Sequence, residues 1–308
     1  DPDNTYAYNK LGRVFEKQKN YEEAINQYRK AIEIDPDNTY AYNKLGRVFE
    51  KQKNYEEAIN QYRKAIEIDP DNTYAYTMLG LAFYKQKNYE EAINQYRKAI
   101  EIDPDNTYTY TMLGLAFYKQ KNYEEAINQY RKAIEIDPDY ATAYYNLGTA
   151  FSAQKNYEEA INQYRKAIEI DPAYSIAKVN FAALCLLIED FDEAFKIANE
   201  MLSEKDNSID EILAMKFIIV YSLLCQGKRS EASIAMKEFI EYYKLIMKEY
   251  SRVCRYIDIK MFVEGYNKIT KTDRRFMLYV IGILESTKRA GDIKIKKLES
   301  SLSELFKE

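Results

Sequence analysis

The chain has 308 residues, of which 46% are hydrophobic, and a net charge of −4. It contains no histidine, which excludes Ser-His-Asp and Cys-His catalysis, histidine metal sites and histidine pH switches. No apolar run reaches about 18 residues, so the sequence predicts no membrane span. The three cysteines, Cys185, Cys225 and Cys254, lack a framework spacing, so they argue against a disulfide scaffold and favour a reducing, cytoplasmic location.

The dominant feature of the sequence is a repeated stretch, KQKNYEEAINQYRKAIEIDP, which first runs from Lys17 to Pro36. It returns unchanged at Lys51, Lys85 and Lys119, and a fifth copy covers residues 154–172. The step is 34 residues each time. A fixed period of this length is typical of a repeat array in which each unit contacts only its neighbours.

Each unit predicts two helices. In the first unit they cover about residues 5–18 and residues 21–34, because apolar residues share one helical face in both segments. Asn20 is the expected N-cap of the second helix. Asp35 and Pro36 end that helix, since the residue before a proline is disfavoured in the α region.

The pattern of the first unit resembles that of a known family. The residues that carry the resemblance are Tyr8, Leu11, Gly12, Phe15, Ala24, Tyr28, Ala31 and Pro36. They fall at the positions of the tetratricopeptide repeat pattern, which implies an all-α fold: a right-handed α-solenoid superhelix of helix-turn-helix repeats. Gly12 and Ala24 would let the two helices of a unit approach closely. Lys19 stands where the family often has glycine, so Lys19 or Asn20 is expected to take a left-handed conformation.

The resemblance divides the chain into three regions. Residues 1–174 hold five near-identical units, residues 175–243 two divergent units, and residues 244–308 a helical C-terminal cap. The seventh unit follows after a step of 38 residues, from Ala194 to Ala232, and its four extra residues are expected in the loop near residues 205–209. The final helix carries an apolar stripe that is predicted to cover the end of the core rather than to form a coiled coil: Ile295, Leu298, Leu302 and Leu305.

Two features concern the array as a whole. Residues 1–4 read like the end of a preceding repeat, so the first helix is expected to expose an apolar face and to support end-to-end self-association. The near identity of the five copies indicates either recent duplication or an idealised, engineered repeat portion joined to a natural end.

In the tetratricopeptide repeat family the first helices line a concave groove, and here those helices carry most of the differences between copies. The predicted partner-binding residues are Tyr6, Asn9, Arg13, Tyr40, Asn43, Arg47, Tyr74, Thr77, Leu81, Tyr84, Tyr108, Thr111, Leu115, Tyr118 and Tyr145. Arg13 and Arg47 are expected either to hold an acidic peptide or to pair with Glu16 and Glu50 on their own helices.

These observations favour a scaffold that binds a protein or peptide in the groove, with no catalysis, cofactor or metal, since no phosphate loop, metal spacing or catalytic set occurs. One alternative is a structural array that self-associates without a dedicated ligand. Another is that the basic C-terminal helices contact nucleic acid or another anionic surface. Residues 244–308 hold 15 Lys or Arg and nine Asp or Glu. Because acids separate these bases along several helices, a solvated surface is preferred over nucleic-acid binding.

Overall fold

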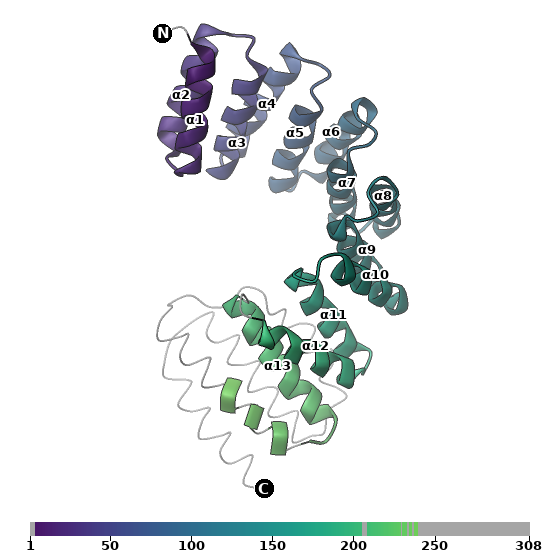
Figure 1. Cartoon of the computed structure of the whole chain (residues 1–308). Coiled ribbons are helices and arrows are strands. Elements are labelled where there is room, and N and C mark those ends of the chain that lie inside the picture. The colour runs from purple at the N-terminus through teal and green to yellow at the C-terminus, as the bar shows by residue number, and fades with distance from the viewer. Residues whose placement is uncertain (1–3, 205–207, 229, 233, 236, 240–308) are drawn as a thin grey trace. The chain divides into compact units, whose positions relative to one another are not determined.

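The computed structural model describes residues 4–204, 208–228, 230–232, 234–235 and 237–239 (Figure 1). Within them the regular elements are α-helices. The helices are α1 (Thr5–Lys17), α2 (Tyr21–Ile34), α3 (Thr39–Lys51), α4 (Tyr55–Ile68), α5 (Thr73–Lys85), α6 (Tyr89–Ile102), α7 (Thr107–Lys119), α8 (Tyr123–Ile136), α9 (Ala141–Ala153), α10 (Tyr157–Ile170), α11 (Ser175–Leu187), α12 (Phe191–Ser203) and α13 (Ile209–Cys225). The helices predicted within residues 244–308 lie outside the described part.

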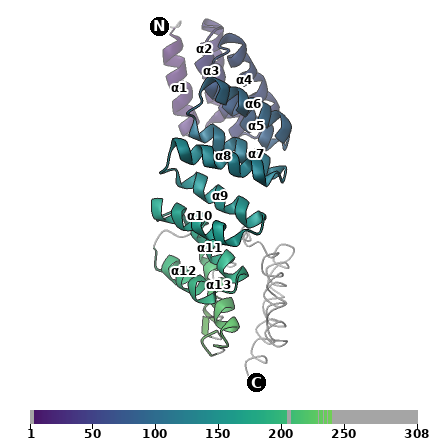
Figure 2. The ribbon, with the colours of Figure 1, turned by 90° about the vertical axis from the view of Figure 1, so that its right-hand side faces the viewer.

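The chain divides into two compact units, residues 1–156 and residues 157–308. In the first unit, consecutive helices pair as hairpins, α1 with α2 through α7 with α8, and each hairpin packs on the next (Figures 1 and 2). The odd-numbered helices also contact one another in order from α1 to α9. They therefore form one continuous layer of this unit.

Each hairpin is held by a glycine of its first helix against a tyrosine of its second. A Cβ added at Gly46 would lie 2.7 Å from Cε1 of Tyr62, and one at Gly80 would lie 2.6 Å from Cε1 of Tyr96. Both tyrosines are fully buried. Only a residue without a side chain permits this approach, which confirms the predicted role of the glycine at this repeat position.

Local sequence sets the ends of the helices. The Asn20 side chain accepts a hydrogen bond from the Glu23 amide at 3.4 Å, which confirms Asn20 as the N-cap of α2. The residue before it, Lys19, has a φ of 60°, and the equivalent lysines of the next four units have φ values between 62° and 65°. The predicted left-handed turn is therefore made by lysine in all five units, at a conformational cost that glycine would avoid.

In the second unit, α10 contacts α11, α11 contacts α12, and α12 contacts α13. The expected insertion in the loop before α13 is wrong. This helix begins at Ile209, 34 residues after the start of α11 at Ser175, so the loop keeps the repeat in register. The added length lies in α13 itself, which has 17 residues where α11 has 13. Four residues are about one helical turn, so the insertion extends the helix without rotating its faces much.

Candidate protein-binding surface

A row of exposed tyrosines follows the odd-numbered helices of the first unit. Four consecutive repeats each place one tyrosine at the second position of the odd-numbered helix, and each remains exposed: Tyr6 (66%), Tyr40 (44%), Tyr74 (39%) and Tyr108 (42%). The helix that carries each tyrosine has an asparagine N-cap and ends at a lysine, so the four rings recur at regular places along the stack. Exposed aromatic rings in a regular row form a surface that can take up apolar or cationic groups.

Three of the predicted partner-binding residues are buried. Asn43 is 7% exposed, and Thr77 and Thr111 are each 3% exposed. The hydroxyls of Thr77 and Thr111 each donate to the backbone carbonyl four residues earlier, at 2.9 and 3.0 Å. Thr77 Oγ1 also lies 2.9 Å from Thr109 Oγ1 of the next repeat. The next repeat covers this position, so these side chains serve packing between repeats and do not line an accessible surface.

The remaining predicted residues are accessible to differing degrees. Arg13 is exposed, whereas Asn9, Leu81, Tyr84, Leu115, Tyr118 and Tyr145 are half-buried. The ring of Tyr84 lies 5.5 Å from that of Tyr89 on α6, and the equivalent pair in the next repeat is separated by 5.4 Å. Burial raises the pKa of Tyr84 to about 12, with a smaller effect of Tyr89, so this phenol stays neutral and can donate a hydrogen bond.

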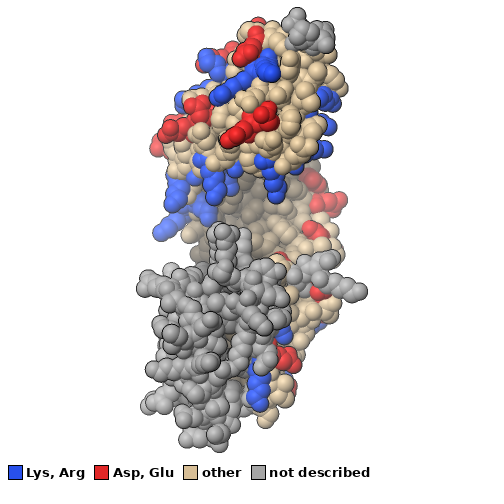
Figure 3. All heavy atoms as spheres, turned by 90° about the vertical axis from the view of Figure 1, so that its left-hand side faces the viewer, with Lys and Arg blue, Asp and Glu red and all other residues tan. Residues whose placement is uncertain are grey.

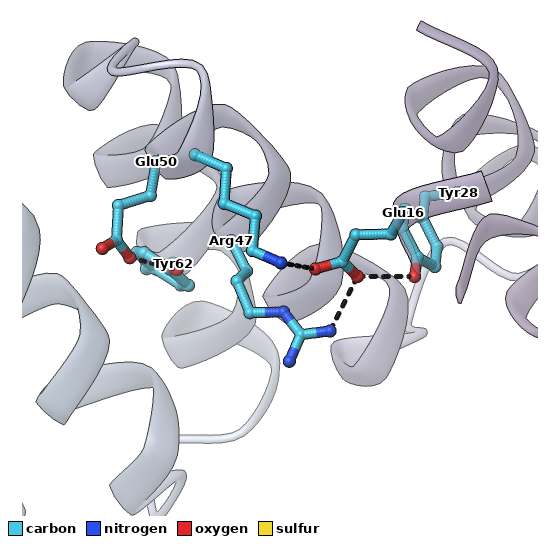
Figure 4. A network of polar contacts seen from close by, with 6 residues as sticks. Glu16, Tyr28, Arg47, Glu50 and Tyr62 are labelled. Carbon is cyan, nitrogen blue, oxygen red and sulfur yellow. Dashed lines mark hydrogen bonds and ion pairs between the residues drawn. The ribbon is translucent and has the colours of Figure 1, made fainter. Parts of the chain in front are cut away.

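An ion-pair network joins the first two repeats (Figure 4). Arg47 Nη2 lies 2.7 Å from Glu16 Oε2, and Lys51 Nζ lies 2.9 Å from Glu16 Oε1. The hydroxyl of Tyr28 donates to Glu16 Oε2 at 3.4 Å. Burial opposes ionisation of Glu16, but hydrogen bonds and charge from Arg47 and Lys51 hold its pKa below the ordinary value. The predicted pairing of Arg47 with Glu50 on its own helix is wrong, because the guanidinium reaches back to the preceding repeat instead.

Glu50 is the equivalent of Glu16 one repeat later, and it lacks that arginine (Figure 4). The residue equivalent to Arg47 is Leu81. The described residues offer the Glu50 carboxylate one hydrogen bond, from the hydroxyl of Tyr62 at 3.5 Å, and no cation within ion-pair distance. Burial raises the pKa of Glu50 above its ordinary value, and the more distant charge of Lys85 only partly offsets this effect.

A lysine of α3 lies among the tyrosines of the row. Lys44 Nζ is 5.0 Å from the centre of the Tyr40 ring and 5.6 Å from that of Tyr74. Burial lowers the pKa of Lys44, followed by repulsion from Arg47. Neither Lys44 nor Glu50 is among the predicted partner-binding residues. Comparing each repeat position with its neighbour across the interface, rather than along one helix, would have indicated both.

The surface of the first unit also carries repeated charge. Lys17, the last residue of α1, recurs in the next three copies, and Lys19 in the turn after it recurs in the next four. Figure 3 shows Lys and Arg side chains gathered along the lower edge of the N-terminal helices. Across the described residues, His, Cys, Asp and Glu side chains do not gather into a metal-binding group. No helix in that part of the chain combines the length and apolar character needed to cross a bilayer.

Sequence models of one family match most of the first unit and continue beyond it. A model described as "TPR repeat" matches residues 12–53, 49–87, 80–121 and 114–155. A model described as "Tetratricopeptide repeat" matches residues 141–174. Together these segments cover more than half of the chain. No curated protein matches the sequence.

Several solved structures are similar in fold. A structure from the functional characterisation of PilF from Pseudomonas aeruginosa is 24% identical, with a TM-score of 0.57, over 67% of this chain and 93% of that one. PilW, a type IV pilus biogenesis factor, is 16% identical, with a TM-score of 0.60, over 66% and 94%. A chain of the APC/C hetero-tetramer Cut9–Hcn1 is 18% identical, with a TM-score of 0.58, over 71% of this chain and 43% of that one. These similarities show an all-helical array of paired helices.

Proposed function

Because the chain belongs to the tetratricopeptide repeat family, we propose that its first unit binds an extended segment of a partner protein along the side formed by the odd-numbered helices, without catalysis. The observation that carries this proposal is the row of four exposed tyrosines, one on each of α1, α3, α5 and α7. A fold relative, from the APC/C hetero-tetramer Cut9–Hcn1, occurs in an assembly with a partner protein.

The chemistry of the row suits protein recognition. Tyrosine supplies a large apolar ring and a polar hydroxyl while immobilising few rotatable bonds, and it is enriched among residues that dominate binding energy. Leu81 and Leu115 add half-buried aliphatic surface on α5 and α7. The proposed anchors are therefore Tyr74 and Tyr108, with the two leucines beside them on the same helices.

A peptide array probed with the intact chain tests the proposal. The variants Tyr74→Ala and Tyr108→Ala should each weaken the selected peptides by roughly tenfold or more, as expected when an anchor worth about 1–2 kcal/mol is truncated. Tyr55→Ala, on the even-numbered helix α4, is the matched control and should leave binding unchanged. Circular dichroism verifies that all variants fold. Failure to select any peptide, or equal loss with the control, would overturn the proposal.

A second candidate function, self-association, rests on the face of α1. Leu11 and Val14 are 45% and 48% exposed, whereas their equivalents Leu45 and Val48 are 2% and 0% exposed under the preceding repeat. Sedimentation velocity over a range of concentrations tests this. Leu11→Lys should reduce any dimer fraction, and a purely monomeric wild type at high concentration contradicts the idea. The proposed alternative role of the basic C-terminal helices concerns residues outside the described part.

A further inference from the structure

The first two repeats supply their own cations to the inner surface. Arg47 neutralises Glu16, with its Nη2 atom 2.7 Å from the carboxylate. Lys44 places its ammonium group over the rings of Tyr40 and Tyr74 at 5.0 and 5.6 Å. The molecule thus shows directly how this repeat frame holds a guanidinium on a carboxylate and a cation against its tyrosines.

The third repeat loses both cations at once. In α5, Leu81 stands at the position of Arg47 and Met78 at the position of Lys44. Yet the acid of the second repeat, Glu50, and the tyrosines of the third and fourth repeats, Tyr74 and Tyr108, are kept. Of the three cations in the arrangement one repeat earlier, the third repeat thus keeps only Lys85, the equivalent of Lys51, and Tyr74 still has Lys44 5.6 Å from its ring.

The electrostatic environment of Glu50, Tyr74 and Tyr108 is consistent with a site that lacks a bound cation. Burial raises the pKa of Tyr74 and of Tyr108, and the charge of Glu50 adds to the rise in both, while the charge of Arg47 opposes it at Tyr74. Arg47 and Lys51 also act on Glu50 from a distance, but both side chains bond to Glu16. Lys85, the equivalent of Lys51, has the largest charge effect on Glu50, but within the described residues it makes no ion pair with Glu50.

We propose that Glu50, together with the exposed tyrosines Tyr74 and Tyr108 of α5 and α7, receives an arginine side chain of the bound partner segment, so that the ligand preferred by this surface is basic. The ligand guanidinium would take the place that Arg47 takes on Glu16, and the half-exposed tyrosine rings would cover its planar faces. Arginine is favoured over lysine because its planar fork can bond the carboxylate and stack on a ring together. This inference rests on the proposed function and specifies its ligand.

The test uses two small probes and the full chain. Nα-acetyl-arginine methylamide is compared with Nα-acetyl-citrulline methylamide, which has nearly the same shape without the charge. Nuclear magnetic resonance of chain labelled at the glutamate carboxyl carbons follows the signal that disappears in Glu50→Gln. The arginine probe should shift this signal and lower the pKa of Glu50, whereas the citrulline probe should do neither. Equal shifts with both probes would overturn the proposal.

The chain offers a matched variant that closes the site. Leu81→Arg restores the residue that the first two repeats carry at this position, so it should fold and place an internal guanidinium on Glu50. Binding of the arginine probe should then weaken by at least about tenfold, as expected for loss of a charge-assisted bond. An Asn94→Arg variant adds the same side chain at an exposed position of the even-numbered helix α6, and it should bind the probe as the wild type does. Unchanged binding to Leu81→Arg would contradict the inference.

The same experiments separate this inference from the proposed function. Array peptides whose binding depends on Tyr108 but is unaffected by exchanging arginine for citrulline would refute the cation site and leave the protein-binding surface standing. Conversely, an arginine probe that shifts the Glu50 signal, with no peptide selected by the array, would retain the cation site and refute the peptide-binding function.

Discussion

Glu16 and Glu50 occupy the same repeat position, and their opposite environments predict opposite effects of the same substitution. Glu16→Gln removes a carboxylate whose side chain is 3% exposed and which bonds Arg47 at 2.7 Å and Lys51 at 2.9 Å. Breaking a fully buried ion pair costs about 3–5 kcal/mol. Since the Arg47 and Lys51 side chains are 34% and 46% exposed and can regain water, the cost here is expected to be roughly 1–3 kcal/mol at pH 7.

Glu50→Gln should instead be neutral or stabilising at pH 7. Its carboxylate has one hydrogen bond, from Tyr62, and burial raises its pKa, so the folded state disfavours the charged form. The amide keeps the shape of the side chain and removes that charge. The two variants therefore differ in the sign of the change in unfolding free energy although they alter equivalent residues.

The pH dependence follows from the direction of each pKa shift. The folded pKa of Glu16 is below the ordinary value of 4.5, so its stabilisation is present above that pH and is lost as the pH falls through the folded pKa. The deficit of Glu16→Gln should shrink on acidification. The folded pKa of Glu50 is above 4.5, so wild-type stability falls as the pH rises from 4.5 through that pKa, and the advantage of Glu50→Gln grows over the same window.

The assay is urea unfolding followed by circular dichroism between pH 3.5 and 8, fitted with a nearest-neighbour repeat scheme because arrays can unfold in parts. The double variant Glu16→Gln/Arg47→Leu supplies the cycle that isolates the pair energy. A Glu16→Gln variant as stable as the wild type at pH 7, or a deficit that persists unchanged at low pH, would refute the assignment of this network.

Three further predictions concern packing, the turns and the thiols. Gly80→Ala should destabilise the chain by roughly 1–2 kcal/mol in the same unfolding assay. The added Cβ would lie 2.6 Å from the buried Tyr96 ring, and this strain exceeds the gain in helix propensity. Unchanged stability would contradict the close contact. Lys87→Gly should stabilise by about 0.5–1 kcal/mol and raise Tm, since φ is 65° at this turn; a lower Tm would show that the left-handed lysine is not strained. Burial raises the pKa of Cys185 to about 12, so its thiol should be alkylated at pH 8 much more slowly than that of half-buried Cys225. Peptide mass spectrometry measures both rates, and equal rates would refute this prediction.

The helices of the repeats could be predicted closely because their signals are local. The predicted first helix ends one residue beyond the observed end of α1 at Lys17, and the second matches α2. The Asn20 cap and the left-handed Lys19 also depend on a few neighbouring residues. Each of these features repeats with the 34-residue period, so five copies provide the same evidence.

Contacts between repeats were harder to predict. Thr77 was expected on the accessible side, but the following repeat buries it and Thr109 shares its hydroxyl. Arg47 was expected to bind a ligand or its own helix, but it bonds Glu16 across the interface. A family pattern gives the position of a side chain within one repeat. Its partner depends on which residue the neighbouring repeat brings beside it.

The ion pair across the first interface has a consequence for the order of the modules. The even-numbered helices of the first five repeats are identical in sequence, so the frame alone would permit any permutation. The side chains of the odd-numbered helices restrict the order, because Arg47 forms an ion pair with an acidic residue of the preceding repeat. Placing the third repeat ahead of the second would set Tyr84 in the place of Glu16 and leave that guanidinium without a counter-charge. The order of these nearly identical repeats is thus constrained by one residue on each side of an interface, here Glu16 and Arg47.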